Sequence, residues 1–294
     1  MKTAVVLNPK AGSVGDVAAI RARLEALRPS EFLVSQRPEE ATAFARQAAA
    51  AGVELIVSAG GDGTLNEVVN GIAETNTAIA LVPLGTGNDF ARSIRIPDLE
   101  TAFAQIASAN FRAIDLVRVT SDAVRHYVNV SSGGFSGLVD EKLTPEMKQT
   151  WGPLAYLRSA AAAFSDLRAY RTQIVLDDTQ TLEEHLYNVI IANGSYVAGG
   201  IPIAPSASLT DGLLDIVLLR ASSNTALALV APQILLGKHL DSDAVVFLRA
   251  RKVSLKSQPG MWFNVDGELV GNEPATFEAL PRALRCIVGP DENA

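Results

Sequence analysis

Apolar segments of strand length alternate with segments of helical periodicity in the first part of the chain. The expected strands are Ala4–Leu7, Glu31–Val34, Glu54–Ser58, Ala78–Val82 and Arg112–Val119, and the expected helices are Asp16–Leu27, Glu39–Ala51, Leu65–Ala73, one from Asp89 and Leu99–Ala109. Strands and helices that alternate in this way form a parallel sheet with crossover helices. We therefore expect an N-terminal α/β domain of the doubly wound type.

The pattern changes after about Asp122, where β-branched and alternating segments dominate. Two helical stretches, Leu154–Tyr170 and Thr225–His239, interrupt these segments, and a last apolar run, Leu284–Val288, is compatible with either sheet. We predict an α/β domain at 1–124, with 279–294 as a candidate completion, and a β-rich domain at 125–278. The expected strands of the second domain are Tyr127–Ser131, Thr172–Leu176, Leu186–Ala192, Asp215–Leu219, Lys252–Lys256 and Trp262–Asp266.

Composition and charge narrow the classes of function. The 294 residues are 48% hydrophobic and 19% charged, which indicates a folded globular chain with room for two domains. A formal net charge of -7 argues against nucleic acid as a partner, because phosphate-backbone binding needs clustered Lys and Arg. The lone Cys286 forms no intramolecular disulfide, which fits a reducing cytoplasm.

The chain offers no expected membrane-spanning segment. The apolar run near the N-terminus is too short for a signal-peptide core, and no uncharged run reaches the ~18–20 residues that span a bilayer. We therefore expect a cytoplasmic protein whose membrane contact is peripheral, at the inner face of the membrane.

Gly60-Gly61-Asp62-Gly63-Thr64 is the strongest local signal. It lies between the apolar segment Val53–Ala59 and the helix expected from Leu65. Glycines there let a backbone approach a phosphate, and the helix start offers unpaired N–H groups. A simple tight turn is the alternative. Asp62 favours a nucleotide loop with Mg²⁺, because a carboxylate beside a phosphate needs a cation between them.

Two further polar turns follow strands in the same way. They are Pro83-Leu84-Gly85-Thr86-Gly87-Asn88-Asp89 and Asn8-Pro9-Lys10-Ala11-Gly12-Ser13. Because open α/β sheets bind ligands at the carboxyl ends of their strands, we expect all three turns to meet at one edge. Two rival motifs fail: Phe90 replaces the last glycine of a dinucleotide fingerprint, and Gly237-Lys238 is followed by His239 and lacks the upstream glycine of a P-loop.

The ordered set of these motifs resembles the diacylglycerol kinase catalytic-domain family, in particular its bacterial soluble lipid kinases. The resemblance covers nearly the whole chain. It implies an NAD kinase and diacylglycerol kinase-like nucleotide domain followed by a β-sandwich domain, with ATP as phosphate donor and Mg²⁺. It rests on Asn8-Pro9, Gly60–Thr64 with Leu65-Asn66-Glu67, Pro83–Asp89 with Phe90-Ala91, Ile114-Asp115, Thr210–Leu214 and Asp266-Gly267-Glu268.

The resemblance assigns roles residue by residue. It implies that the nucleotide is bound by Asn8, Ser35, Gly60, Gly61, Asp62, Gly63, Thr64, Leu65, Asn66, Glu67, Thr86 and Asn88. Ser35 stands where the family usually has a threonine, and the loop at Lys10 is a variable version of the family's first loop.

The resemblance also implies two kinds of cation site and a general base. Asp62, Asp89 and Asp115 match the carboxylates that organise catalytic Mg²⁺, whereas Asp89 read alone is a helix N-cap residue and Asp115 a solvent-facing strand residue. Glu268 matches the base, with Asp62 as second catalytic candidate. A structural Mg²⁺ or Ca²⁺ is implied at Ser208, Asp211 and Leu213, where a plain Asp-Gly turn is the alternative.

The expected activity is phosphorylation of a hydroxyl on diacylglycerol or a similar lipid at the membrane surface. Apolar segments at Trp151–Tyr170 and Ile201–Pro205 are compatible with lipid contact, although core packing is the preferred explanation of the first. A soluble-metabolite kinase of the NAD kinase type and a non-catalytic nucleotide-binding regulator are the alternatives. A homodimer is left open.

Overall fold

The computed structural model describes residues 1–12, 16–135, 167–265, 268–271 and 274–290. The chain divides into two compact units. Unit 1 comprises Met1–Leu116 with Pro281–Ala294, and unit 2 comprises Val117–Leu280.

Unit 1 contains a parallel sheet in the order β2-β1-β3-β4. Its strands are β1 (Thr3–Leu7), β2 (Glu31–Val34), β3 (Leu55–Gly60) and β4 (Ala78–Pro83), and all three adjacent pairs are parallel. Every residue of β3 and β4 is buried, as expected for strands covered on both faces. The sheet is therefore the core of an α/β sandwich.

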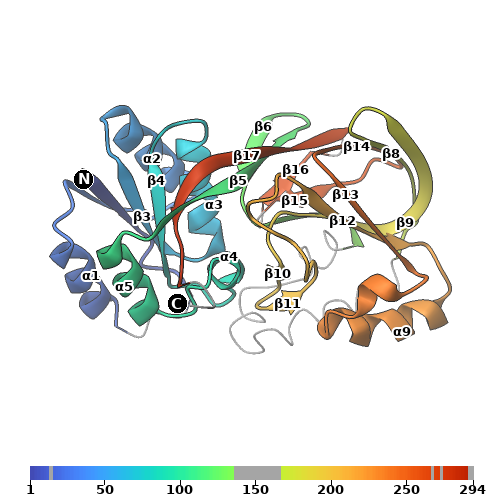
Figure 1. The fold of residues 1–294 in the computed structure, drawn as a ribbon, viewed down its shortest axis with the longest axis horizontal. Coiled ribbons are helices and arrows are strands. Elements are labelled where there is room, and N and C mark those ends of the chain that lie inside the picture. Colours follow the sequence, from blue (N-terminus) through green and yellow to red (C-terminus); the bar gives the residue numbers. More distant parts are fainter. Residues whose placement is uncertain (13–15, 136–166, 266–267, 272–273, 291–294) are drawn as a thin grey trace. The chain divides into compact units, whose positions relative to one another are not determined.

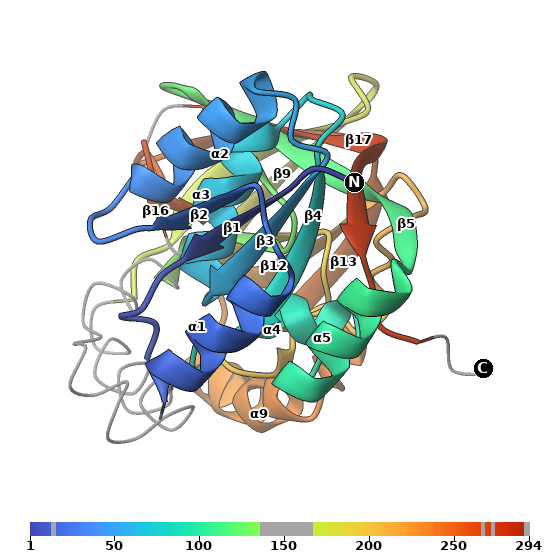
Figure 2. The same ribbon diagram turned by 90° about the vertical axis from the view of Figure 1, so that its left-hand side faces the viewer.

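Helices cover both faces of this sheet (Figure 2). They are α1 (Val17–Ala26), α2 (Glu40–Ala50), α3 (Asp62–Ile72), α4 (Asp89–Ser93) and α5 (Leu99–Ser108). In Figure 2, α2 and α3 lie on one side of the sheet and α1 and α5 on the other. The predicted doubly wound α/β domain is confirmed.

The sequence sets the local features of these helices. Asp16 and Asp98 are the N-caps of α1 and α5, and their side chains accept the N–H groups of Ala19 and Thr101. Gly71 lets α3 approach α2 closely, because a Cβ there would lie 2.6 Å from the Ala45 Cβ.

The C-terminal strand returns to unit 1. β17 (Ala275–Ile287) pairs in parallel with β4 at Cys286 opposite Ile79. Its neighbour on the other side is β5 (Phe111–Thr120). Beyond the strand, Asn110 holds the chain by donating to the carbonyls of Val288 and Gly289 at 3.1 and 3.2 Å. The apolar run Leu284–Val288, which the sequence left unassigned, therefore extends the sheet of unit 1.

Unit 2 is a β-sandwich whose described strand pairs are antiparallel. The long strand β9 pairs β8 by its first half and both β7 and β12 by its second half (Figure 1). The described strands of unit 2 are β6 (Val124–Tyr127), β7 (Val130–Gly134), β8 (Tyr170–Leu176), β9 (Gln180–Ala192), β10 (Tyr196–Val197), β11 (Ile201–Pro202), β12 (Leu214–Arg220), β13 (Val245–Ala250), β14 (Lys252–Gln258), β15 (Phe263–Val265) and β16 (Glu268–Val270), with the first part of β17.

Aromatic side chains pack together in the core of unit 2. The Phe277 ring makes edge-to-face contacts with Tyr127 and Phe263, at centroid distances of 6.4 and 5.3 Å. All three rings are at most 2% exposed. Such pairs add about 0.5–1.5 kcal/mol each beyond the area that they bury. Helix α9 (Asn224–Leu235) and the short 3₁₀ helix η2 (His239–Asp241) lie between β12 and β13 in the sequence, and Val230 of α9 packs with Val217 and Val245 of these strands.

Three sequence predictions in unit 2 need correction. The segment Tyr127–Ser131 is two strands, β6 and β7, because the chain leaves β6 at Tyr127 and enters β7 at Val130. Tyr170 begins β8 and is not the end of a helix, because buried and exposed residues alternate from Tyr170 onward, as in a strand with one covered face. The rest of the predicted helix, up to Asp166, lies outside the described residues. Strand β13 was missed despite its run of valines and Phe247.

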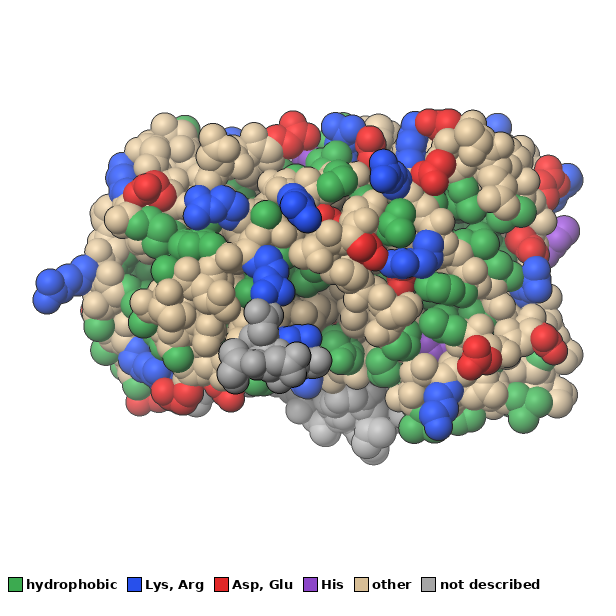
Figure 3. Space-filling model, viewed as in Figure 1, with side chains coloured by type: hydrophobic (Ala, Val, Ile, Leu, Met, Phe, Trp, Pro, Cys, Tyr) green, Lys and Arg blue, Asp and Glu red, His purple; other side chains and the backbone are tan. Residues whose placement is uncertain are grey.

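Among the helices of the described ranges, none is long and apolar enough to cross a bilayer. On the face shown in Figure 3, basic and acidic side chains of the described residues are interspersed, so that this face has no patch of a single charge sign.

Candidate functional site

The turns after β1, β3 and β4 meet at one edge of the unit 1 sheet. The Asn8 amide Nδ2 donates to the Thr64 hydroxyl at 3.0 Å, and a Cβ on Gly12 would lie 3.2 Å from the Thr86 Cγ2. The strand order β2-β1-β3-β4 reverses direction between β1 and β3. This edge is therefore the switch point where open α/β sheets bind ligands. The predicted convergence of the three turns is confirmed.

The two glycine loops touch through their backbones. A Cβ added to Gly85 would lie 2.7 Å from the Gly61 Cα, and one added to Gly61 would lie 3.1 Å from the Gly85 Cα. The Leu84 N–H also donates to the Gly60 carbonyl at 2.8 Å. Glycine at both positions is thus required for the close approach of the loops.

Gly63 differs from these two glycines. It lies in the first turn of α3, and a Cβ added there would meet no atom within 4 Å. Free N–H groups at the first turn of a helix of this length attract anions. Gly63 is exposed, and the space beside it is open at this first turn.

Asp62 links the two loops through its side chain. Its carboxylate accepts the backbone N–H groups of Asp89 and Phe90, both at 3.3 Å, at the start of α4. Burial raises the pKa of the Asp62 carboxyl above its ordinary value, and the N–H groups of Asp89 and Phe90 oppose this shift. A cation beside Asp62 would offset the cost of burying its negative charge.

The Asp62 carboxylate fits Mg²⁺ in its donor chemistry. Both of its oxygens accept backbone N–H groups and share the negative charge that a cation would balance. Asp89 is the first residue of α4 and is 8% exposed. Its own N–H makes one of these bonds, so its carboxylate belongs to the same turn. Hard oxygen donors of this kind are the ligands that Mg²⁺ prefers.

Asn88 shapes the second loop. Its side chain accepts the Gly85 N–H at 2.9 Å and donates to the Gly85 carbonyl at 2.7 Å. Its backbone is left-handed, with φ of 50°, a conformation that Asn tolerates. The structure therefore gives Asn88, and not Asp89, the N-cap position of α4.

Several predicted nucleotide residues have structural partners. Glu67 accepts the Ala41 N–H at 3.0 Å and so caps α2, while the buried Asn66 accepts a bond of 3.0 Å from Asn70. Leu65 is 2% exposed and packs in the core. The buried Ser35 lies at the end of β2, where its N–H donates to the Leu7 carbonyl at 2.9 Å. These contacts fix the loops, and the nucleotide roles of these residues stay predictions.

Lys10 lies in the first turn. Its ammonium Nζ donates to the Gln36 carbonyl at 3.0 Å, which ties this turn to the end of β2. The structure thus gives Lys10 a contact that its variable sequence context did not reveal.

Asp115 is completely buried, so it is not the solvent-facing strand residue that its pattern alone suggested. Its Oδ1 accepts the Arg282 N–H at 2.8 Å. Arg282 has a positive φ of 54°, so Asp115 stabilises an irregularity in β17. Its role in binding Mg²⁺ stays a prediction.

Asp211 lies in the turn that precedes β12 in unit 2. Its Oδ1 accepts the Leu213 N–H at 3.0 Å, and its Oδ2 contacts the Arg249 guanidinium. Arg249 was missed from the sequence, because it lies on the overlooked strand β13. The run of β-branched and aromatic residues at Val245, Val246 and Phe247 is the signal that would have revealed it.

Glu268 begins β16, opposite Val265 in the β15–β16 hairpin. Asp266 and Gly267, the rest of its motif, lie outside the described residues. In the described part of the chain, no group of three or more His, Cys, Asp or Glu side chains is arranged to hold a metal.

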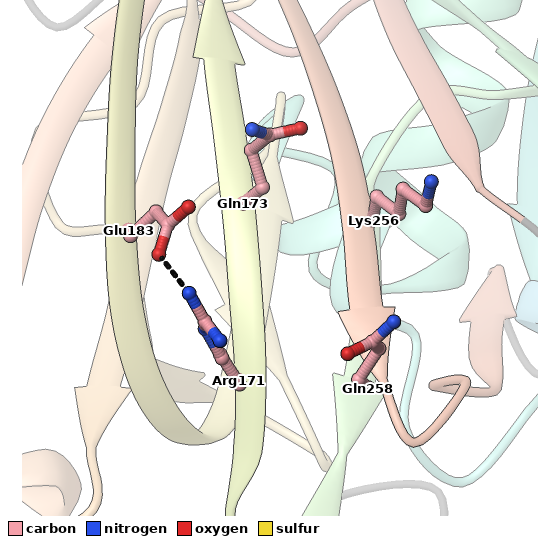
Figure 4. Close-up of a pocket in the computed structure, with 5 residues that line it drawn as sticks. All are labelled: Arg171, Gln173, Glu183, Lys256 and Gln258. Carbon is pink, nitrogen blue, oxygen red and sulfur yellow. Dashed lines mark hydrogen bonds and ion pairs between the residues drawn. The ribbon is translucent and has the colours of Figure 1, made fainter.

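One polar hollow lies on the exposed side of β8, β9 and β14 (Figure 4). Its walls are the side chains of Arg171, Gln173, Glu183, Lys256 and Gln258. Arg171 and Glu183 form an ion pair of 2.8 Å across it. Exposed pairs of this kind contribute little to stability, and a hollow lined by polar and charged residues does not suit an acyl chain. We assign the hollow no function.

Comparison with known proteins gives this geometry a context. The family model described as diacylglycerol kinase catalytic domain matches residues 2–119, and the one described as YegS C-terminal NAD kinase beta sandwich-like domain matches residues 129–288. The diacylglycerol kinase of Bacillus subtilis (strain 168) is 31% identical over 259 residues, which cover 87% of this chain and 84% of that protein. The chain belongs to the diacylglycerol kinase family.

Other relatives of this diacylglycerol kinase family member agree in sequence and fold. A Pseudomonas aeruginosa protein named "Probable lipid kinase YegS-like" is 32% identical over 289 residues, which cover 97% of this chain and 93% of that protein. A diacylglycerol kinase structure from Bacillus anthracis has a TM-score of 0.80 at 26% identity, covering 98% of this chain and 97% of the other.

The fold is shared more widely than the family. An NAD kinase from Archaeoglobus fulgidus, solved in complex with ATP, has a TM-score of 0.54 at 14% identity and covers 98% of this chain and 94% of the other. That likeness supports the fold alone. The family and the fold predicted from the sequence are confirmed, with an α/β first domain and a β-sandwich second domain.

Proposed function

We propose that this kinase family member transfers the γ-phosphate of ATP to a hydroxyl of diacylglycerol or a similar lipid, with Mg²⁺ as cofactor. The observation that carries the proposal is the contact of the two glycine loops, with the Asp62 carboxylate bonded between them, at the sheet edge. This arrangement supplies open backbone for phosphates and oxygen donors for a cation in one place.

The residues of unit 1 perform the binding part of the reaction. The first turn of α3, open at Gly63, faces the phosphates with its N–H groups. Asp62 and Asp89 would hold Mg²⁺, which when bound neutralises charge on the transferred phosphoryl group. Asn8 and Thr64 fix the loop that surrounds the phosphates.

Glu268 is proposed as the general base. Phosphoryl transfer needs one group that accepts the proton of the substrate hydroxyl, and a glutamate at this motif suits that task. The support is the family membership together with the position of Glu268 at the start of β16. We propose that the partner of the whole protein is a lipid at the membrane surface, which the protein reaches by peripheral association at the inner face of the membrane.

The proposal is tested with the full purified chain and γ-labelled ATP. Parallel reactions contain detergent-dispersed diacylglycerol, sphingosine or phosphatidylglycerol, or NAD without lipid, each with Mg²⁺ or with EDTA. After organic extraction we expect Mg²⁺-dependent label in the organic phase, strongest with diacylglycerol. The Asp62→Asn variant serves as the inactive control.

The other outcomes of that experiment separate the alternatives. Label on NAD in the aqueous phase would identify a soluble-metabolite kinase. ATP binding without transfer to any acceptor would identify a regulator. Sedimentation with phospholipid vesicles checks the peripheral association independently of turnover.

A further inference from the structure

Arg249 occupies a defined place between two carboxylates of unit 2. It lies on β13 directly opposite Asp215 on β12, so strand register fixes its position. Its Nε donates to the Asp215 Oδ1 at 2.7 Å, and its Nη2 contacts the Asp211 Oδ2. One guanidinium therefore joins the turn before β12 to the strand itself.

The Asp215 carboxylate is the buried member of this cluster. Its side chain is 1% exposed, against 38% for Arg249 and 29% for Asp211. Its other oxygen, Oδ2, accepts the Ser206 hydroxyl at 3.0 Å. A buried carboxylate is costly unless a cation and further hydrogen bonds compensate it, and Arg249 with Ser206 supply both. Asp215 foremost, with Asp211, raises the pKa of the Arg249 guanidinium.

The cation predicted for this turn would use the same carboxylate. The expected donors were Asp211 and the carbonyls of Ser208 and Leu213, so Asp211 is the only charged ligand. Its Oδ1 accepts the Leu213 N–H and its Oδ2 contacts Arg249. A divalent ion on Asp211 would lie beside a guanidinium that is always charged, and the two would repel each other. The donor set does not fit a metal in this arrangement.

We propose that Arg249 is the resident cation of this turn and replaces the divalent ion predicted there. The guanidinium balances Asp215, holds Asp211 and fixes the Ser206–Leu213 connection that leads into β12. Because β12 pairs both β9 and β13, this contact secures the centre of the unit 2 sheet. The inference rests on unit 2 alone and does not depend on the proposed activity.

If Arg249 takes the place of a divalent ion, stability and kinase activity should depend on divalent ions differently. Stability of unit 2 should not respond to Mg²⁺ or Ca²⁺, whereas phosphoryl transfer requires Mg²⁺. The test measures melting temperature in EDTA, in MgCl₂ and in CaCl₂ without nucleotide. It uses the Asp62→Asn background, so that a cation in unit 1 contributes no signal. We expect melting temperatures within about 1 °C of one another, because an ion that does not bind the folded state adds no stability.

Substitution of the arginine gives the second readout. Arg249→Met keeps much of the side-chain volume and leaves Asp215 buried without a cation, so we expect the melting temperature to fall by about 10 °C. The matched control is Arg251→Met, at an exposed arginine two residues further along, which should melt within about 1 °C of the parent. Arg249→Lys and Asp211→Asn are weaker changes that serve if Arg249→Met does not fold, and each should lower the melting temperature without creating a response to divalent ions.

Two results would overturn the inference. The first is a fall of several degrees in the melting temperature of the parent protein in EDTA that the Asp211→Asn substitution abolishes. Such a result would mean that a divalent ion binds the turn. The second is an Arg249→Met variant that melts at the parental temperature.

Discussion

The Asn8 amide donates a hydrogen bond of 3.0 Å to the Thr64 hydroxyl, which joins the turn after β1 to the first turn of α3. The two residues are 56 positions apart in the chain. Their bond spans the point at which the strand order of the sheet reverses. Each side chain therefore positions the loop that carries the other.

A double-mutant cycle tests this relationship. We expect Asn8→Ala and Thr64→Val each to raise the KM for ATP, and the double variant to lose about 1 kcal/mol less than the sum, because one hydrogen bond is lost in all three. Thr64→Ser, which keeps the hydroxyl, is the control. Fully additive effects would mean that the bond does not contribute to nucleotide binding.

The glycines of the loops predict opposite effects of one substitution. Gly85→Ala places a Cβ 2.7 Å from the Gly61 backbone, so we expect a loss of about 1–3 kcal/mol in unfolding free energy. Gly63→Ala meets no atom within 4 Å and lies in a helix, so stability should stay equal or rise by up to about 1 kcal/mol. Denaturant unfolding measures both.

Gly63→Ala also reports on the ligand. If phosphates occupy the open space beside Gly63, the stable variant should bind ATP more weakly, which calorimetry detects. Unchanged ATP affinity would show that the nucleotide lies elsewhere.

Asp62→Asn should remove most of the kinase activity and leave the overall fold intact. One of the two backbone hydrogen bonds to the side chain is lost, because the asparagine NH2 group cannot accept an N–H. Asparagine has nearly the same volume but lacks the negative charge that would hold Mg²⁺, and lost electrostatic stabilisation of a transition state costs about 10²–10³-fold in kcat. Circular dichroism checks the fold. Near-normal turnover at saturating Mg²⁺ would contradict the role given to Asp62.

Glu268→Gln should lower kcat by about 10²–10⁴-fold and change the KM for ATP little. Glutamine keeps the shape of the side chain and loses its basicity, while the nucleotide is bound by unit 1. Steady-state kinetics with lipid as the varied substrate separate the two constants. If turnover stays within about threefold of the parent protein, Glu268 is a turn residue.

His239 predicts a dependence of stability on pH. It is fully buried, and its Nε2 lies 2.9 Å from the Ile203 carbonyl. Burial lowers the pKa of its imidazole below the ordinary 6.5. The unfolded chain then binds more protons than the folded one just below pH 6.5, so the contribution of His239 is complete above that pH and is lost as the pH falls.

The measurement is the free energy of unfolding between pH 5 and 7.5. His239→Gln should flatten the slope below pH 6.5 by up to about 1.4 kcal/mol per pH unit, which corresponds to one proton. Equal slopes for His239→Gln and the parent protein would rule out His239 as the source.

The local units of the fold follow from the sequence because their causes are local. Apolar runs such as Ala78–Val82 specify buried strands, and Gly60–Thr64 specifies the sharp passage from β3 into α3. Strand β13 and the start of β8 at Tyr170 were misjudged. In both places sheet pairing, rather than the residues alone, determines the conformation.

The sequence by itself determined the family, the order of the two domains and the meeting of the three turns, since carboxyl ends of parallel strands share one edge. Only the tertiary structure decided the partners of the aspartates: Asp62 with the N–H groups of Asp89 and Phe90, Asp115 with Arg282, and Asp211 with Arg249. These partners lie 27 to 167 residues away along the chain. Strand register and loop packing bring them together, and both depend on the whole core of a unit rather than on neighbouring residues.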